Sequence, residues 1–247
     1  MVIEVDLKPG SRVIADLHLG VIDLEDVQPF LRWLEELGDV PRLLILGDLF
    51  DYWVGPAQAR FAGTSHVLAG LATRVAGGTA VDIVPGNRDF LLGTGFERLT
   101  GCRVHHGGLV GTTPAGQRVL FVHGDELSTL DRNYQRMRRV LRTRLVRWTA
   151  PRLPGLADLA ARRLRRVSSE VVEKKPRAEV EMQVEAARTL AERHRAGLVV
   201  CGHGHRYREE PLGGDSRWIV LDAFGGERDT LEVASGGDLA LSGAPDG

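Results

Sequence analysis

Five short polar clusters divide this chain, and four of them directly follow a run of mostly branched apolar residues. In chain order the clusters are Asp16-Leu17-His18, Gly47-Asp48, Gly86-Asn87-Arg88-Asp89, His123-Gly124-Asp125 and Gly202-His203-Gly204-His205. Short apolar runs of this kind are typical of strands buried on both faces. Open α/β sheets bind ligands just beyond the carboxyl ends of their strands. We therefore expect one sheet edge to collect all five clusters.

The sequence between the clusters predicts an α/β alternation. Strands are expected near 2–5, 12–15, 43–46, 81–84, 119–122, 198–201, 217–221, 230–234 and 238–241. Helices are expected near 26–37 and 65–76; in the first, apolar residues recur at helical spacing and Gly38 follows where a C-terminal cap belongs. Beyond residue 122 the sequence predicts roughly 60 helical residues, broken at Pro151, Pro154 and Pro176.

The size of the chain limits its organisation. A chain of 247 residues suits one large domain better than two domains and a linker, so we expect a single domain over 1–247 with a helical insertion at about 130–195. The acidic start and the lack of an apolar run of ~18 residues predict neither a signal peptide nor a membrane span. Cys102 and Cys201 match no disulfide or zinc spacing, which is typical of a reducing cytosol. These features predict a cytoplasmic location.

The clusters hold the ligand types that a two-metal phosphoesterase needs. Two divalent cations ~3.5–4 Å apart can hold a phosphate, lower the pKa of a bridging water and stabilise the charge that develops on attack. Imidazoles, carboxylates and an amide oxygen suit such a pair, and the chain offers Asp16, His18, Asp48, Asn87, His123, His203 and His205. In an Asp-x-His at a strand end, both side chains point to one side and could chelate one ion. Any one cluster alone could be a turn or a core histidine, so it is their order that predicts the metal site.

This order of motifs resembles the calcineurin-like metallophosphoesterases over most of the chain. The resemblance implies a four-layer α/β/β/α sandwich and two metal ions, for which we expect Mn²⁺. By resemblance, one metal would be bound by Asp16, His18, Asp48 and His205, and the other by Asp48, Asn87, His123 and His203, with Asp48 as the bridge. Asp51, Asp89 and Asp125 would orient imidazoles or fix loops, and simple turn formation is the equal alternative.

Arg88 departs from the general pattern, since most of the superfamily has a histidine after Gly-Asn. A guanidinium does not release its proton at working pH, so general acid catalysis from this position is lost. A phosphate monoester has a second pKa near ~6 and can leave unprotonated. The exchange therefore favours cleavage of a phosphoanhydride, with Arg88 clamping phosphate oxygens. A surface arginine in a turn is the alternative.

The run from Gly86 to Gly93, Gly47-Asp48-Leu49-Phe50 and the segment 123–135 are similar to the UDP-2,3-diacylglucosamine pyrophosphohydrolases of the lipid A pathway. That resemblance implies attack of a metal-bound hydroxide on the α-phosphorus, giving UMP and 2,3-diacylglucosamine 1-phosphate, with Asp48 and Arg88 as catalytic residues. It implies substrate contacts from Arg88, Asp131, Tyr134, Arg165, Ser168, Lys175 and His203, with the adjacent Arg166, Ser169 and Lys174 as the alternatives to Arg165, Ser168 and Lys175. Gly204 and Tyr207 depart from that family and leave the exact substrate open. The alternatives are another phosphodiester or pyrophosphate, from a nucleotide or nucleic acid, and an inactive metal-binding scaffold.

The predicted insertion is strongly basic, because residues 132–166 hold twelve arginines and one acid, Asp158. Met137, Leu141, Leu145 and Trp148 would share one helical face. Basic amphipathic helices of this kind bind anionic lipid, with about 1 kcal/mol from each Arg. We expect a lid over the lipid and peripheral binding to the inner face of the cytoplasmic membrane; a helical hairpin with a solvated basic face is the alternative. A nucleic-acid partner is not expected, because stacking aromatics are scarce. The oligomeric state is left open.

Overall fold

The computed structural model describes residues 2–149, 152, 155 and 181–241, and within these residues the strands form two six-stranded sheets. Sheet A contains, in spatial order, β1 (Ile3–Asp6), β6 (Leu109–Thr112), β7 (Arg118–Phe121), β8 (Leu198–Cys201), β10 (Ser216–Val220) and β9 (Arg208–Gly213). Sheet B contains β12 (Leu239–Leu241), β11 (Leu231–Val233), β2 (Arg12–Ile14), β3 (Arg42–Ile45), β4 (Ala80–Ile83) and β5 (Arg103–Val104). Both sheets are mixed, with parallel strands at their centres.

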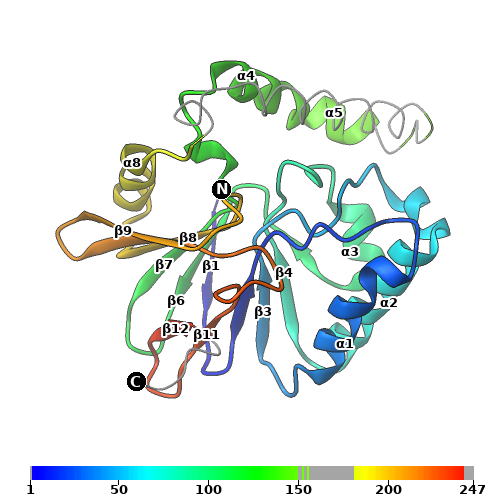
Figure 1. Ribbon diagram of the computed structural model, residues 1–247, viewed down its shortest axis with the longest axis horizontal. Helices are drawn as coiled ribbons and strands as arrows, with labels where there is room; N and C mark the ends of the chain where they lie inside the picture. The colour runs from blue at the N-terminus through cyan, green and yellow to red at the C-terminus, as the bar shows by residue number, and fades with distance from the viewer. Residues whose placement is uncertain (1, 150–151, 153–154, 156–180, 242–247) are drawn as a thin grey trace.

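Helices cover the outer faces of the two packed sheets (Figure 1). Sheet B carries α1 (Gln28–Glu36), α2 (Ala62–Ala76) and α3 (Thr94–Thr100). Sheet A carries α8 (Val184–His194). The order of layers is helix, sheet, sheet, helix, which confirms the α/β/β/α fold implied by the resemblance.

Three buried apolar clusters hold these layers together. One joins the helices to sheet B and includes Phe30 and Leu34, which lie one turn apart on α1. A second lies between the sheets and includes Val13 and Val119. The third joins α8 to sheet A and includes Ala187. Full burial of a large apolar side chain contributes roughly 1.5–3 kcal/mol, so the layers are held by their faces and the strand ends can carry polar groups.

The strands that precede the five clusters belong to both sheets. The Asp16, Asp48 and Asn87 clusters follow β2, β3 and β4 of sheet B, whereas the His123 and His203 clusters follow β7 and β8 of sheet A. The expectation that one sheet edge collects all five is therefore wrong. Each sheet is apolar on both faces, because one face meets the other sheet and the other meets helices. Apolar runs from two sheets consequently look alike in sequence.

The predicted insertion begins with α4 (Arg132–Leu141) and α5 (Arg144–Thr149), which lie at the side of the molecule where β7 and β8 end (Figure 1). The first helix ends at Leu141, earlier than the predicted break at Pro151. On the predicted apolar face, Leu145 and Trp148 are 69% and 59% exposed. Residues 153–154 and 156–180 lie outside the described residues, and the boundaries of the insertion stay a prediction.

Candidate metal centre

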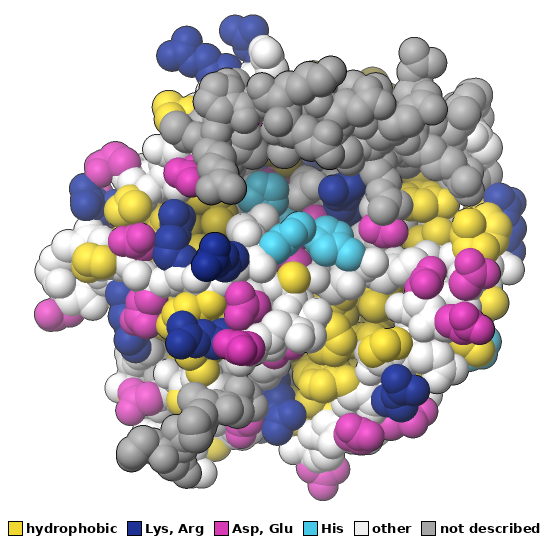
Figure 2. Space-filling model, viewed as in Figure 1, with side chains coloured by type: hydrophobic (Ala, Val, Ile, Leu, Met, Phe, Trp, Pro, Cys, Tyr) yellow, Lys and Arg dark blue, Asp and Glu magenta, His cyan; other side chains and the backbone are white. Residues whose placement is uncertain are grey.

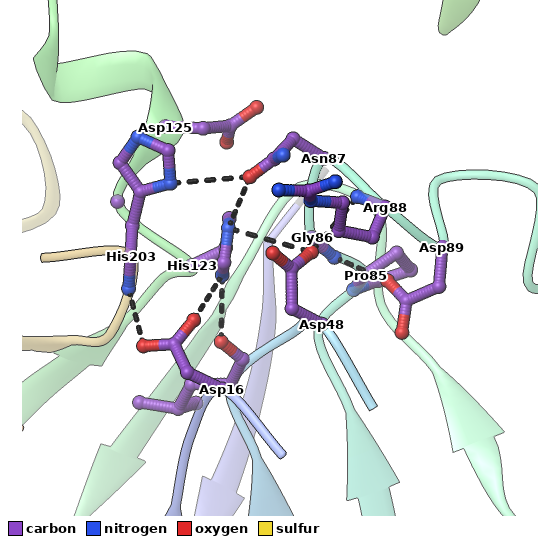
Figure 3. Close-up of polar contacts among 12 residues, drawn as sticks. Asp16, Asp48, Pro85, Gly86, Asn87, Arg88, Asp89, His123, Asp125 and His203 are labelled. Atoms are coloured by element: carbon purple, nitrogen blue, oxygen red, sulfur yellow. Dashed lines mark hydrogen bonds and ion pairs between the residues drawn. The ribbon is translucent and has the colours of Figure 1, made fainter. Parts of the chain in front are cut away.

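The seven predicted ligands lie together, beyond the ends of five strands. Figure 3 shows Asp16, Asp48, Asn87, His123 and His203. Gly86 and Gly202 permit this approach, because a Cβ at either position would collide with the carboxylate of Asp48 or of Asp16, respectively. On the molecular surface, histidine side chains gather near the middle of one face, beside basic and acidic ones (Figure 2). The site is thus assembled between the two sheets and is open to solvent on one side.

Four of these residues form a compact group of ligand atoms. One atom from each of Asp16, His18, Asp48 and His205 lies within 4.8 Å of every other. The Nε2 atoms of His18 and His205 are 3.0 Å apart, and the Oδ1 atom of Asp16 is 3.8 Å from Nε2 of His205. That Oδ1 is buried and accepts no hydrogen bond from the part of the chain that the structure describes. Two facing imidazole nitrogens beside a carboxylate oxygen fit a divalent cation.

A second group lies on the other side of Asp48. The Oδ1 atom of Asn87 is 3.0 Å from Nε2 of His123 and 3.1 Å from Nδ1 of His203. Nε2 of His123 is also 3.8 Å from Oδ1 of Asp48. The amide oxygen, the carboxylate oxygen and two imidazole nitrogens make a second donor set of the predicted type.

Asp48 lies between the two groups and faces each with a different oxygen. Its Oδ2 atom is 3.9 Å from Nε2 of His18, whereas its Oδ1 atom faces His123. The ring of His123 is oriented by the backbone, because its Nδ1 lies 2.8 Å from the carbonyl oxygen of Leu46. Donation from Nδ1 leaves Nε2 as an acceptor that can bind a metal. The predicted orienting role of an aspartate is thus filled at His123 by a carbonyl group.

The charges of the site also fit divalent cations. Burial raises the pKa of Asp16 and of Asp48 to about 6 in each case, because the carboxylates lose hydration. Burial lowers the pKa of His203 to about 3, which favours the neutral imidazole that metals require. Burial also lowers the pKa of His123, but the Asp48, Asp16 and Asp125 carboxylates and the hydrogen bond to the Leu46 carbonyl raise the pKa to about 9. A cation bound here would stabilise the carboxylates and displace the His123 proton.

The backbone is unusual at most of the predicted ligands. Among described residues other than glycine, positive φ angles occur at Asp16, His18, Asp48, His203, His205 and Arg195. This left-handed conformation costs an L-residue roughly 1–2 kcal/mol. Asp16 and His18 therefore approach each other through a tight left-handed turn. The strand alternation expected for Asp-x-His is wrong here, because β2 has already ended at Ile14.

Asp89 joins two of the ligand loops. Its side chain is fully buried; Oδ1 accepts a hydrogen bond of 2.7 Å from the amide of Gly86, and Oδ2 accepts one of 2.8 Å from the amide of Leu49. These amides lie next to Asn87 and Asp48. The fixing of loops predicted for Asp89 is what the geometry shows, and the same role for Asp51 stays a prediction.

Asp125 begins the 3₁₀ helix η3 (Asp125–Leu127) and also fixes the chain around it. Its Oδ2 atom accepts hydrogen bonds from the Tyr134 hydroxyl at 2.7 Å, Arg138 Nε at 2.7 Å and Arg142 Nη2 at 3.0 Å. Burial would raise the pKa of Asp125, but Arg142, His123 and Arg138 hold it well below its usual value. Asp125 is thus a charged anchor between α4 and the loop that carries His123.

The predicted substrate contacts fall in three places. Arg88 lies at the metal centre, where its backbone N–H donates to Asp48 Oδ1 at 2.8 Å. Asp131 is buried and caps α4 by accepting from the Tyr134 amide at 3.0 Å, while the Tyr134 hydroxyl binds Asp125. These contacts show structural roles, and substrate contact by either residue stays a prediction. Arg165, Ser168 and Lys175 lie outside the described residues.

The sequence did not single out Arg138 and Arg142, which it counted only as part of the basic insertion. Both are largely buried, with side chains 20% and 16% exposed, and both pair with Asp125. Their spacing was an available signal, because Tyr134, Arg138 and Arg142 follow one another at intervals of four and so share a helix face. The buried Asp125 thus neutralises part of the positive charge of the insertion.

Comparison with known proteins identifies the family. The model of the calcineurin-like phosphoesterases matches residues 12–207. A UDP-2,3-diacylglucosamine hydrolase of Pseudomonas aeruginosa is 33% identical over 229 residues, which cover 91% of this chain and 95% of that protein. The enzyme of the same name from Pseudomonas paraeruginosa is 34% identical over 230 residues with the same coverage, and that from Tolumonas auensis is 34% identical over 203 residues, 78% of each chain.

This chain belongs to the calcineurin-like phosphoesterase family. It is a hydrolase that acts on phosphorus anhydride or ester bonds, as the motif order predicted. Its cofactors are divalent metal ions, in agreement with the Asp and His cluster. Among the described helices, none is long and apolar enough to cross a membrane.

Proposed function

We propose that this enzyme hydrolyses the pyrophosphate of UDP-2,3-diacylglucosamine, a reaction of lipid A biosynthesis. Water adds to the α-phosphorus, the bond from that phosphorus to the bridging oxygen breaks, and the products are UMP and 2,3-diacylglucosamine 1-phosphate. Relatives named for this substrate match 91% of the chain and support the proposal. The observation that carries it is a guanidinium, that of Arg88, at the metal centre in place of a proton donor.

The position of Arg88 suits an anhydride substrate. Its backbone is held by Asp48, and Figure 3 shows its guanidinium beside Asn87. Within the described residues the guanidinium makes no hydrogen bond or ion pair, so its donors remain available to phosphate oxygens. A sugar phosphate leaves unprotonated because its second pKa is near ~6. A fixed positive charge therefore serves this leaving group better than a general acid would.

The metal ligands would hold two divalent cations, which we take to be Mn²⁺. Bound in such a pair, cations lower the pKa of a water molecule and neutralise phosphate charge. Asp48 would hold both sites in register, since its two oxygens face different imidazoles. We assign the remaining substrate contacts to His203, Asp131 and Tyr134, together with Arg165, Ser168 and Lys175.

The helices α4 and α5 suit the surface of an anionic membrane. Val140, Leu145 and Trp148 are 61%, 69% and 59% exposed. Arg136 and Arg139 are exposed on the same helical segment. Apolar side chains interleaved with arginines favour partition into a lipid interface. We infer that this segment is part of a lid over the acyl chains and binds the inner face of the cytoplasmic membrane peripherally.

A paired assay tests the proposal. Purified protein is incubated with UDP-2,3-diacylglucosamine or with bis(4-nitrophenyl) phosphate, with Mn²⁺ or with chelator. We expect Mn²⁺-dependent UMP release from the lipid nucleotide and little cleavage of the aryl diester. The reverse preference contradicts the proposal and supports the phosphodiester alternative. No turnover of either compound would leave only a metal-binding scaffold.

A variant tests the role of Arg88. Arg88→His should reduce UMP release about 10²–10³-fold, the usual loss when one oxyanion donor is removed. Its Mn²⁺ stoichiometry should stay unchanged, because the metal contacts of this loop come from Asn87. Arg98→His, at an exposed position on α3, is the matched control. Equal UMP release from Arg88→His and wild type would show that Arg88 does not bind the phosphate oxygens in the transition state.

A further inference from the structure

Arg142, just after α4, connects two loops that carry predicted metal ligands. Its Nη2 atom donates to the carbonyl oxygens of Pro85 at 3.3 Å and Gly86 at 3.1 Å, and to Oδ2 of Asp125 at 3.0 Å. Gly86 immediately precedes Asn87 in sequence, and Asp125 follows His123 by two residues. One largely buried guanidinium thus spans the gap between the β4 loop and the β7 loop.

Asp125, which anchors this guanidinium, makes several contacts with α4. Asp125 is fully buried and also binds Tyr134 and Arg138, so three side chains from one helix face converge on a single carboxylate oxygen. The side-chain amide of Gln135 adds a hydrogen bond of 2.8 Å to the Asp125 carbonyl. Hydrogen bonds between charged groups are stronger than those between neutral groups. The Asp125 carboxylate therefore anchors α4 to the core.

The contacts are selective for one of the two donor sets. Asn87 and His123 both belong to the second set, and their ligand atoms are only 3.0 Å apart. A small separation of the two loops would remove one of them from a shared ion. No hydrogen bond or ion pair between α4 and the loops of Asp16, His18 or His205 occurs among the described residues. Movement of α4 should therefore affect the second set and largely spare the first.

We propose that Arg142 is a positioning residue that couples docking of α4 to cation binding at the set formed by Asp48, Asn87, His123 and His203. When α4 is docked, Arg142 holds the Asn87 and His123 loops at the spacing that one ion requires. When α4 is displaced, that link is lost and the ion is held less tightly. The inference rests on the proposed ligand assignment but is independent of the proposed substrate.

Coupling of this kind must act in both directions. If docking of α4 strengthens cation binding by some factor, cation binding strengthens docking by the same factor. Loss of a residue that orients metal ligands usually weakens metal affinity about 10–100-fold. The helix that carries the basic, apolar surface of the insertion would then be ordered by the metal centre beneath it.

Metal titration tests the first direction. Free Mn²⁺ is measured by electron paramagnetic resonance during titration of metal-free wild type, Arg142→Ala and Arg139→Ala. Arg139 is exposed on the same helix and carries the same charge, so it is the matched control. We expect Arg142→Ala to bind one Mn²⁺ with unchanged affinity and the other about tenfold more weakly, whereas Arg139→Ala should match wild type. Unchanged affinity at both sites, or equal weakening of both, overturns the proposal.

A double variant identifies the affected site. Asn87→Ala removes a ligand of the second set, so Arg142→Ala should cause no further loss of Mn²⁺ affinity in that background. An additive loss would place the effect elsewhere and contradict the proposal. If Arg142→Ala does not fold, Arg142→Lys keeps the charge and a terminal nitrogen donor, and an affinity of the weak site below that of wild type is then expected.

Hydrogen exchange tests the second direction. Mn²⁺ should slow exchange of the α4 amides in wild type and in Arg139→Ala, but not in Arg142→Ala. Equal slowing in all three proteins would show that α4 responds to metal without Arg142 and would overturn the coupling. None of these measurements uses the lipid nucleotide, so their failure is distinguishable from failure of the proposed function.

Discussion

Asp89→Asn is expected to destabilise the protein although it changes only one atom type. Both carboxylate oxygens of Asp89 accept a backbone N–H, from Gly86 and from Leu49. An amide side chain can accept only one of these, and its NH₂ group then faces the other N–H donor. The variant therefore leaves a buried donor without a partner.

The magnitude follows from these two contacts. Loss of one hydrogen bond to a charged group, with its donor left unpaired, costs about 2–3 kcal/mol. Part of this is offset, because burial raises the pKa of Asp89 and a neutral side chain avoids that desolvation. We expect a net loss of about 2 kcal/mol, which for a chain of this size lowers Tm by about 4–8 °C.

Calorimetry on chelated protein at neutral pH measures this loss without a contribution from bound metal. Asp39→Asn is the control, because Asp39 is exposed and the charge change is identical. The two amides held by Asp89 lie next to Asp48 and Asn87, so Mn²⁺ affinity should fall as well, by about tenfold. A Tm of Asp89→Asn equal to that of Asp39→Asn would refute the reasoning.

Two further predictions concern stability away from the metals. Burial alone would raise the pKa of Asp82, but the His105 hydrogen bond and the charges of Arg42 and Arg103 hold it below its usual value. A carboxylate whose pKa is lowered on folding stabilises the folded state at pH values above its unfolded-state pKa. This stabilisation is lost as pH falls through the folded-state pKa. Asp82→Asn should therefore lower the free energy of unfolding, measured in urea, by about 2–4 kcal/mol at pH 7 and by less below about pH 4. A difference between variant and wild type that does not change with pH contradicts this. Arg195→Gly should raise the urea midpoint, with a gain of about 0.5–1 kcal/mol, because Arg195 ends α8 at φ 51°; a lower midpoint contradicts this.

Strands buried on both faces were predictable from the sequence, because they consist of consecutive apolar residues. The run Leu198–Cys201 was predicted with its bounds and is fully buried. β6 and β9 were missed for physical reasons. β6 contains Gly111, and β9 is a largely exposed edge strand of sequence REEPLG that presents no apolar run. Edge strands are fixed by their neighbours and only weakly by their own side chains.

The metal site was predictable as a set of residue types but not as an arrangement. Side-chain chemistry and motif order pointed to the seven ligands. The orientation of His123 by the Leu46 carbonyl could not be predicted, because every residue has a carbonyl group. The role of Arg142 depends on two carbonyls as well. Contacts made by backbone atoms depend on the tertiary fold, and the pattern of side chains does not encode them.

The left-handed residues link the stability of the site to its chemistry. At Arg195 the side chain is exposed, so glycine would relieve the strain without loss of a ligand. At Asp16, His18 and Asp48 glycine would relieve similar strain but remove a donor. The strain is held there by the other ligand loops, since the His18 amide donates to the Asp48 carbonyl at 2.8 Å and the His203 amide donates to Asp16 Oδ2 at 2.6 Å.

Each ligand loop is thus braced by a neighbouring ligand. Asp48 Oδ1 faces His123 and also accepts from the Arg88 amide. Asp16 holds the β8 loop through Oδ2, while its Oδ1 has no hydrogen bond within the described chain. Asp16 therefore fixes a loop with Oδ2 and leaves Oδ1 for the site, whereas Asp48 fixes the Arg88 loop with the same oxygen that faces His123. Strained backbone persists only where its surroundings over-determine it, and here the surroundings are the ligands themselves. Loss of any one carboxylate should consequently disturb both donor sets.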